Sequence, residues 1–184
     1  MLTNATSSQH QRDNAAQRDA RHDAERWLLL RTRSRHERIV ARAAAAAGFV
    51  TVFPMTKCSR AYGDRTLRVD VPLLPGAVFV RATVQSVAEL RERGWLTEVV
   101  EIADQEQAEH DLKQLANAAT VAGLDISAAE YCADATRVEV RTGPLQGLRG
   151  VISRQRRDVL LLPVHAVGRA LSVEVDPASL QVVS

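Results

Sequence analysis

Arginines are the side chains of this sequence whose type and spacing point to a chemistry. Between Arg26 and Arg42 stand six arginines and a single acid, Glu37. A guanidinium group can form two parallel hydrogen bonds to a phosphate, so such a cluster suits contact with a nucleic-acid backbone. The same cluster would also suit an ordinary solvated face. The sequence has only two lysines, and an arginine-rich codon usage would produce the same excess of arginine.

The residue types needed for catalysis or metal binding do not form a set. Five histidines are scattered without the spacing of a metal site, and neither a nucleophile elbow nor a glycine-rich phosphate loop is present. Cys58 and Cys132 lie far apart and suit reduced packing residues. We therefore expect a protein that is not an enzyme and that holds neither a cofactor nor a metal.

The acids are separated from this basic cluster along the chain. The segment Glu98–Asp111 holds six acids and neither a lysine nor an arginine. The two sides of the first domain are then expected to differ in sign. Such polarity orients a protein on an acidic polymer better than the formal net charge of +2 implies.

The basic cluster must be positioned by a strand and the helix that follows it. The apolar run Trp27–Leu30 predicts a buried strand, and Ser34 is a suitable N-cap for a helix ending near Ala47. Arg35, Arg38 and Arg42 share one face of that helix. Arg31 and Arg33 lie in the loop just before it.

The rest of the first half alternates between strands and helices, which predicts an α+β domain. Strands are expected over 49–53, 67–71, 77–80 and 95–101, and the two flanks of 57–65 predict a hairpin with a long basic loop. Ser86–Glu89 matches a capping box for a short helix. Asp104 is a suitable N-cap for a helix to about Ala119, with Ala108, Leu112 and Leu115 on its apolar face.

The second half changes to short β segments. Five of them follow 135, most separated by a glycine or proline, which predicts a small closed barrel. The polar start cannot bury enough apolar surface to fold. We therefore divide the 184 residues into a disordered leader (1–24), an α+β domain (25–120), a linker (121–135) and an all-β domain (136–184). The longest low-polarity stretch is too short to span a bilayer, so a soluble cytoplasmic protein is expected.

Two prolines bracket the stretch on which the first domain is centred. Pro72 and Pro75 enclose a Leu-Leu pair, and Gly76 precedes the apolar strand. Together with Trp27–Thr32 and Phe53–Met55, the segment Pro72–Val80 resembles the NusG N-terminal (NGN) domain, whose members carry W-Y-x-(L/V)-x-(T/C), x-P and P-L-(F/L)-P-(G/N)-Y-(L/V)-F-V. In the second domain, Val140–Ile152 is similar to the KOW motif, G-P-x-x-G-x-x-G-x-V.

The resemblance implies an NGN domain with a four-stranded antiparallel sheet flanked by helices, followed by an SH3-like KOW barrel. It implies a transcription elongation factor that docks on the clamp helices of the β′ subunit of RNA polymerase, contacts the non-template DNA strand and suppresses pausing and termination. The matching positions place Leu74, Pro75, Ala77 and Phe79 on the polymerase-binding surface. The residues implied to face DNA are Arg31, Arg33, Arg35, Arg38 and Arg93.

The resemblance also implies partners. These are RNA polymerase, with its β subunit as a further candidate contact, the non-template strand, and the ribosome or a termination factor as candidates for the KOW domain. No membrane partner is expected, and the protein is expected to be a monomer. Substituting Ala for Phe79 or Asp for Leu74 is expected to weaken polymerase binding without unfolding the domain.

The branch of the family is a separate prediction. The Phe-Pro-Met and Pro-Leu-Leu-Pro segments, and the lack of a large insertion, resemble specialised RfaH/UpxY-like antiterminators that act on a few long operons. The alternatives are a general NusG-type factor that couples polymerase to termination or translation, and a ribosomal-type KOW protein that binds RNA. In some specialised members of the family the second domain folds as a helical hairpin that covers the clamp-binding site. Here glycines and prolines would fall inside such helices, so we expect the second domain to stay a barrel and to leave that site uncovered.

Overall fold

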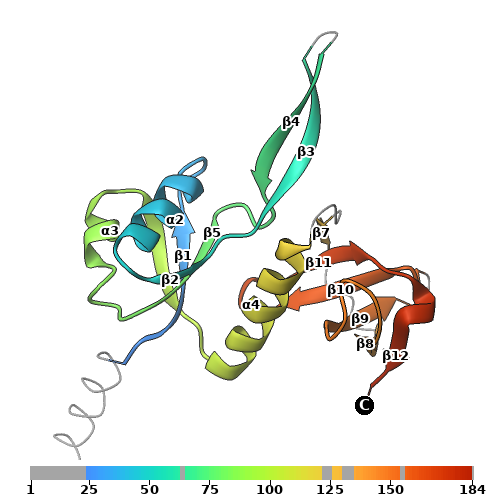
Figure 1. Ribbon diagram of the computed structural model, residues 1–184. Coiled ribbons are helices and arrows are strands. Elements are labelled where there is room, and N and C mark those ends of the chain that lie inside the picture. Colours follow the sequence, from blue (N-terminus) through green and yellow to red (C-terminus); the bar gives the residue numbers. More distant parts are fainter. Residues whose placement is uncertain (1–23, 63–64, 122–125, 130–134, 154–155, 184) are drawn as a thin grey trace, which may run out of the picture.

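The computed structural model describes residues 24–62, 65–121, 126–129, 135–153 and 156–183 (Figure 1). The leader predicted for 1–24 lies outside this range apart from Ala24. The domain boundaries predicted from the sequence remain predictions. Within the predicted linker, Ile126–Ala129 form a strand that joins the second sheet.

A four-stranded antiparallel sheet forms the first unit. Its strand order is β2 (Val50–Val52), β5 (Ala77–Ala82), β1 (Arg26–Thr32) and β6 (Leu96–Glu101). Helices α2 (Glu37–Ala46) and α3 (Ala88–Glu92) pack on one face, and α4 (Gln105–Thr120) lies against the other. This arrangement confirms the predicted α+β fold class.

Coverage on both faces explains the uninterrupted apolar run of β1. Because successive side chains of a strand point to opposite faces, Leu28 and Leu30 pack with α2 and α3. Trp27 and Leu29 pack in the other cluster, which contains the apolar residues of α4. A strand enclosed in this way needs apolar residues at every position rather than at alternate ones.

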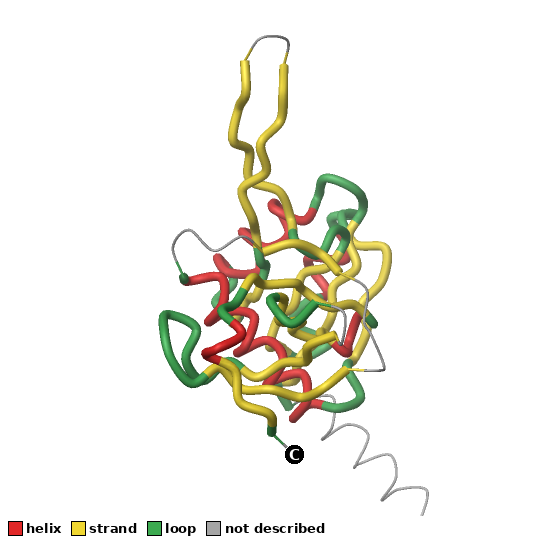
Figure 2. Tube along the Cα trace, turned by 90° about the vertical axis from the view of Figure 1, so that its right-hand side faces the viewer, coloured by secondary structure: helices red, strands yellow, loops and turns green. Residues whose placement is uncertain are grey.

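A long hairpin leaves the first unit beside β5. Strands β3 (Met55–Tyr62) and β4 (Arg65–Pro72) pair only with each other, and the ribbon projects well beyond the body of the molecule (Figures 1 and 2). The long basic loop predicted over 57–65 is therefore wrong, since the strands continue through most of it. The alternation of Leu67, Val69 and Val71 predicted most of β4, whereas the polar residues of the predicted loop gave no strand signal.

Helix starts were only partly predicted. Asp104 caps α4, where its side chain accepts a hydrogen bond from the Gln107 amide, as expected. Ser34 does not cap α2, because the N-cap is His36. Ser86 does not form the predicted capping box; its hydroxyl and that of Thr83 each accept a hydrogen bond from the other residue's amide.

The second unit is a six-stranded antiparallel sheet, which confirms the predicted all-β C-terminal part. Its strand order is β12, β8, β9, β10, β11, β7, so β12 and β7 are its two edges. A core that includes Leu160, Leu162, Leu171 and Val173 fills its concave side. The bounds are β7 Ile126–Ala129, β8 Ala135–Val140, β9 Arg149–Ser153, β10 Val159–Val164, β11 Arg169–Glu174 and β12 Leu180–Val182, with short 3-10 turns His165–Val167 and Pro177–Ser179.

Helix α4 lies between the two sheets (Figure 1). One continuous hydrophobic cluster runs from the first sheet through Leu112 and Leu115 into the second. Polar contacts join the same elements: both the amide and ring Nδ1 of His165 bond to Asp111 Oδ2, at 2.9 and 2.8 Å. The Arg149 amide donates to Gln114 Oε1 at 3.2 Å. Among the described helices, α4 included, none is long and apolar enough to cross a membrane.

Candidate functional site

The turn Leu73–Gly76 is fixed by contacts on both of its sides. The Leu73 amide donates to Pro54 O at 3.0 Å, and the Thr32 amide donates to Gly76 O at 3.0 Å. The Gly76 amide in turn donates to the carboxylate of Glu37, the first residue of α2, at 3.0 Å. Gly76 has a φ of +77°, a conformation that glycine adopts without strain. The turn is therefore held rigidly between β1 and α2.

Three of the four residues assigned to the polymerase surface are buried. Leu74, Ala77 and Phe79 are 2%, 5% and 0% exposed and belong to the cluster that contains α4, whereas Pro75 is exposed. Truncating a fully buried phenylalanine costs about 3–5 kcal/mol. The burial therefore argues against the expectation that Ala at 79 or Asp at 74 would leave the domain folded.

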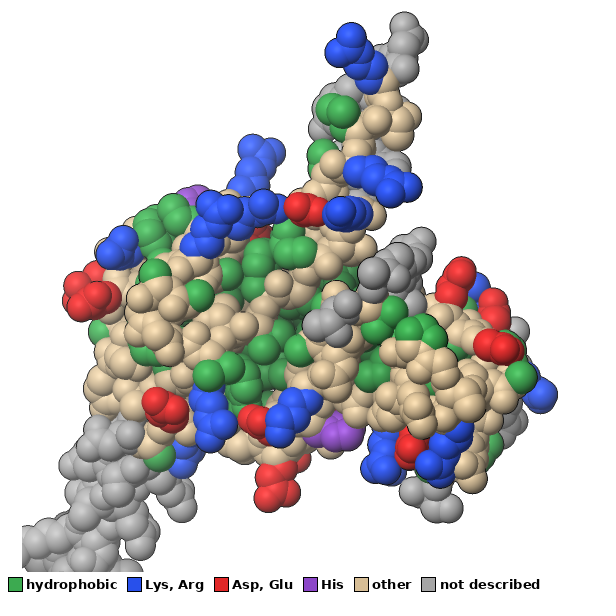
Figure 3. Space-filling model, in the orientation of Figure 1, with side chains coloured by type: hydrophobic (Ala, Val, Ile, Leu, Met, Phe, Trp, Pro, Cys, Tyr) green, Lys and Arg blue, Asp and Glu red, His purple; other side chains and the backbone are tan. Residues whose placement is uncertain are grey.

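The same sheet face remains partly open at its β2 edge. Val52 pairs with Phe79 and is half-buried, and Val50 pairs with Arg81 and is 58% exposed. Figure 3 shows hydrophobic side chains gathered between the first unit and the second sheet. The sequence did not single out these valines, because a three-residue strand is too short to show which face it presents.

Two of the predicted DNA-facing arginines meet at Trp95. The Arg33 amide donates to Trp95 O at 2.9 Å, and the Arg93 guanidinium lies 5.1 Å from the centre of the indole ring. That distance is within the range of a cation–π contact, which holds the Arg93 side chain in place. Arg33 and Arg93, far apart in sequence, thus lie at one end of the sheet.

The other three arginines differ in what they contact. Arg31 lies beside Glu98, with Nε 3.3 Å from Oε2, so its charge is partly compensated. Arg38 Nη2 donates to the carbonyl of Asp70 at 3.3 Å, which joins α2 to the base of the hairpin. Arg35 is exposed and has a φ of +67°. Strained residues of this kind are enriched at functional sites.

The acidic helix α4 is not a uniformly solvated face. Trp27 Nε1 donates a hydrogen bond to Glu109 Oε2, and Lys113 Nζ lies 3.0 Å from the other carboxylate oxygen. The Trp27 hydrogen bond is the main cause that lowers the pKa of Glu109, and Lys113 lowers it further. Glu109 thus fastens α4 to β1. Within the described residues, no group of three or more His, Cys, Asp or Glu side chains could hold a metal ion.

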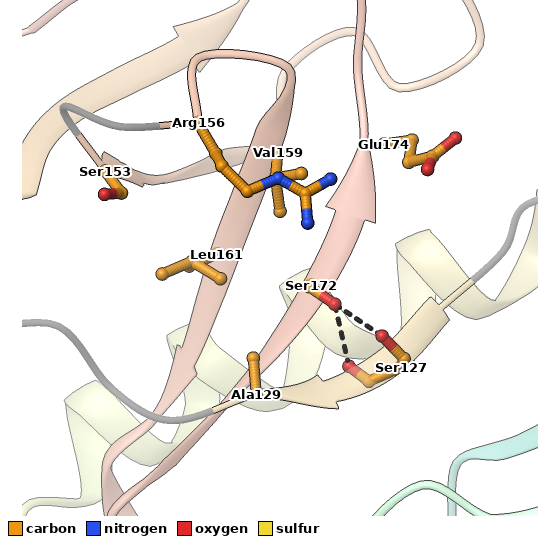
Figure 4. Close-up of a pocket in the computed structure, with 8 residues that line it drawn as sticks. All are labelled: Ser127, Ala129, Ser153, Arg156, Val159, Leu161, Ser172 and Glu174. Carbon is orange, nitrogen blue, oxygen red and sulfur yellow. Dashed lines mark hydrogen bonds between the residues drawn. The ribbon is translucent and has the colours of Figure 1, made fainter.

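A pocket of about 340 Å³ lies on the second sheet (Figure 4). Two serine hydroxyls, from Ser127 and Ser172, are 2.6 Å apart on its wall. The lining contains no histidine that could activate either hydroxyl as a nucleophile, so its residue types do not form a catalytic set. The lining residues are Ser127, Ala129, Ser153, Arg156, Val159, Leu161, Ser172 and Glu174.

Comparison with known proteins places these features in a family. A family model described as transcription termination factor nusG matches residues 25–116, half of the chain. Similar solved structures include one on domain interaction in Thermotoga maritima NusG. It matches at 18% identity and a TM-score of 0.46, with 89% of this chain and 99% of that one covered. A chain of the MjSpt4:Spt5 complex matches at 18% identity and a TM-score of 0.31, with 86% and 97% covered.

The search among curated proteins gave no match. The family model covers the strands, helices and turn that carry the arginine cluster and the Leu73–Gly76 segment. This match shows that the chain belongs to the NusG family of transcription factors.

Proposed function

We propose that this protein is a transcription elongation factor that binds RNA polymerase at the β′ clamp helices, contacts the non-template DNA strand and suppresses pausing and termination. The family match over 25–116 carries this proposal, because that range contains both the proline-bracketed turn and the arginine cluster. The protein acts in the cytoplasm as a monomer. The β subunit is a second candidate contact.

The polymerase contact is centred on Pro75 and the open β2 edge. Pro75 is exposed just before the start of β5, and Val50 is exposed opposite Arg81 near the end of that strand. Val52, opposite Phe79, lies between them. Leu74, Ala77 and Phe79 act as positioning residues beneath it, since they are buried and hold the turn and its strand in place. A rigid apolar turn next to an open sheet edge is suited to docking.

The DNA contact lies at the C-terminal end of β1, where Thr32 bonds to the Leu73–Gly76 turn and Arg33 bonds to Trp95. Arg33, Arg35 and Arg93 present their charges there, and Arg38 extends the surface toward the hairpin. Arg31 takes part less strongly because Glu98 lies beside it. Phosphate contacts of this kind hold a single strand without reading its sequence.

The specialised branch of the family is the finer part of the proposal. The Phe53–Met55 and Pro72–Pro75 segments support an RfaH/UpxY-like antiterminator that acts on a few long operons. The C-terminal domain is then available for the ribosome or a termination factor.

Co-purification of the tagged full-length protein with RNA polymerase, followed by mapping of its chromosomal occupancy, tests the proposal. Polymerase in the eluate and enrichment on one or a few operons support the specialised factor. Uniform occupancy supports a general factor instead. Absence of polymerase would overturn both, and binding to ribosomes alone would favour a ribosomal-type KOW protein.

A further inference from the structure

The projecting β3–β4 hairpin is not used by the proposed polymerase contact. Each strand has eight residues, and the register runs from Met55 opposite Pro72 to Tyr62 opposite Arg65. At about 3.3 Å per residue the ribbon reaches about 26 Å. No other strand of the described residues pairs with either of its edges, so it is an extended surface carried on a narrow base (Figure 2).

The two faces of the ribbon differ in chemistry. Lys57 lies directly opposite Asp70, and because β4 side chains alternate, Arg68 and Thr66 share that face. The opposite face of β4 carries Leu67, which is 52% exposed, together with Val69 and Val71. On β4, one face is therefore polar, with Lys57 opposite its acid Asp70, and the other is apolar except for Arg65 at the tip.

The cations of the hairpin are available to a partner. Lys57, Arg65 and Arg68 are exposed, and no ion pair joins any of them to another described residue. Arg38 bonds to the main chain at the hairpin base, so the basic surface of α2 continues onto the ribbon. Figure 3 shows Lys and Arg side chains from α2 to the hairpin tip.

We propose that this hairpin binds double-stranded DNA directly, with the face that carries Lys57 and Arg68 toward the duplex. A two-stranded β-ribbon fits the major groove of B-DNA, which is about 12 Å wide. Sequence-tolerant binding of a single strand relies on aromatic stacking, and the described side chains of the polar face include no aromatic ring. This activity goes beyond the proposed function, because it needs no polymerase.

The test measures the affinity of the full-length protein for a short fluorescent duplex by anisotropy, without polymerase, over a range of salt concentrations. The variant Lys57→Gln/Arg68→Gln removes two cations from the polar face. Each phosphate contact adds about 0.9 to the slope of log affinity against log salt, so the slope should become shallower by about 1.8. Near 0.1 M salt the affinity should fall at least about tenfold.

The matched control is Arg157→Gln/Arg169→Gln, which removes the same charge from exposed positions of the second sheet. It should leave affinity and slope close to wild type, and circular dichroism should show both variants folded. Arg65→Gln, on the other face of the ribbon, should cause a smaller loss than the double variant.

Three results would overturn the proposal. One is a wild-type protein that does not bind the duplex, and another is a hairpin variant with unchanged affinity and slope. The third is a hairpin variant that keeps its duplex affinity but loses polymerase in co-purification, which assigns the ribbon to a protein partner. A wild-type protein that binds the duplex but not polymerase would instead remove the proposed function and leave this inference standing.

Discussion

Glu37 connects the start of α2 to the turn below Pro75. Its buried carboxylate accepts the hydrogen bond of the Gly76 amide. Replacing Glu37 with Ala leaves that partly buried donor without its acceptor, so we expect the free energy of unfolding to fall by about 1–3 kcal/mol. Urea denaturation measures it. Glu37→Gln retains an oxygen acceptor and should lose less; equal losses in the two variants would contradict the role of this hydrogen bond.

Pro75 is the residue at which the polymerase contact can be tested without disturbing the core. Since its side chain is exposed, Pro75→Glu should leave the unfolding transition nearly unchanged. A charge placed on an apolar contact should weaken polymerase binding about tenfold, or about 1.4 kcal/mol. Pro144→Glu, at an exposed turn of the second unit, is the matched control. Equal polymerase affinity of the two variants would remove Pro75 from the contact.

Phe79 shows where the sequence led to two incompatible expectations. Its apolar strand indicated a buried element, and the strand is buried, while the family resemblance placed Ala77 and Phe79 on a docking surface. A side chain enclosed by α4 cannot do both. The apolar stripe Ala108, Leu112 and Leu115 was the available signal, since a helix with such a stripe must cover some face of the sheet.

At the scale of elements, α4 is fastened to β1 through main-chain and side-chain bonds. The Trp27 amide donates to Gln105 Oε1 at 2.7 Å, and Gln105 Nε2 donates back to Trp27 O at 3.1 Å. The indole of Trp27 then reaches Glu109, one turn further along the helix. These bonds fix the helix start relative to the sheet.

The Trp27–Glu109 bond predicts a pH dependence of stability. The pKa of Glu109 is lowered from 4.5 in the folded state, first by this bond. A group whose pKa falls on folding stabilises the fold above its unfolded pKa, and this contribution is lost as pH falls through the folded pKa. The unfolding free energy should therefore decrease as the pH is lowered from about 5. In Trp27→Phe this decrease should be smaller.

Urea titrations at several pH values provide the measurement, and the comparison is between slopes because Trp27→Phe also changes packing. Trp95→Phe changes a half-buried indole at the opposite end of β1 from Trp27, so it is the control and should keep the wild-type slope. Parallel pH profiles for wild type and Trp27→Phe would show that the bond does not set the Glu109 ionisation.

Most strands, the long helix and the presence of a hairpin could be predicted from the sequence, but the length of the hairpin strands and two caps could not. Burial on one or both faces gives β1, β5 and β10 their apolar patterns, which the sequence displays directly. In the hairpin, Leu67, Val69 and Val71 of β4 alternate with polar residues, whereas residues 56–60 of β3 show no such pattern. Ser34 has the side chain of a cap, yet the turn with Arg35 at positive φ moves the helix start to His36.

At the scale of the whole molecule, Asp111 and Gln114 make polar contacts between α4 and the second unit, and Asp111 is the buried one. Its carboxylate is buried and accepts bonds from Gln107 and from the amide and ring of His165. In Asp111→Ala the His165 amide loses its acceptor. Its hydrogen exchange, followed by NMR, should then be faster by about tenfold or more. Asp158→Ala, which removes an exposed acid from the second unit, should leave that exchange unchanged. Unchanged protection in Asp111→Ala would show that apolar packing alone holds the sheet to the helix.

The sequence predicted two domains but not their arrangement. The pattern of α4 revealed one apolar stripe, whereas the helix contacts a sheet on each side. The second contact includes one buried acid, Asp111, among the six acids of its segment. An acid on a helix is ordinarily solvated, so nothing in the spacing distinguished Asp111 from its neighbours. The relative placement of the units depends on such individual side chains.

The shared helix also limits how this protein can be recombined. A chimera that exchanges the C-terminal part after Thr120 would keep α4 but give it a foreign partner on one side of a continuous core. A chimera that exchanges everything from Gln105 onward would instead replace the helix that packs on Phe79 and Trp27. The two halves of this chain are therefore not interchangeable modules, and they have to change together at the surfaces of α4.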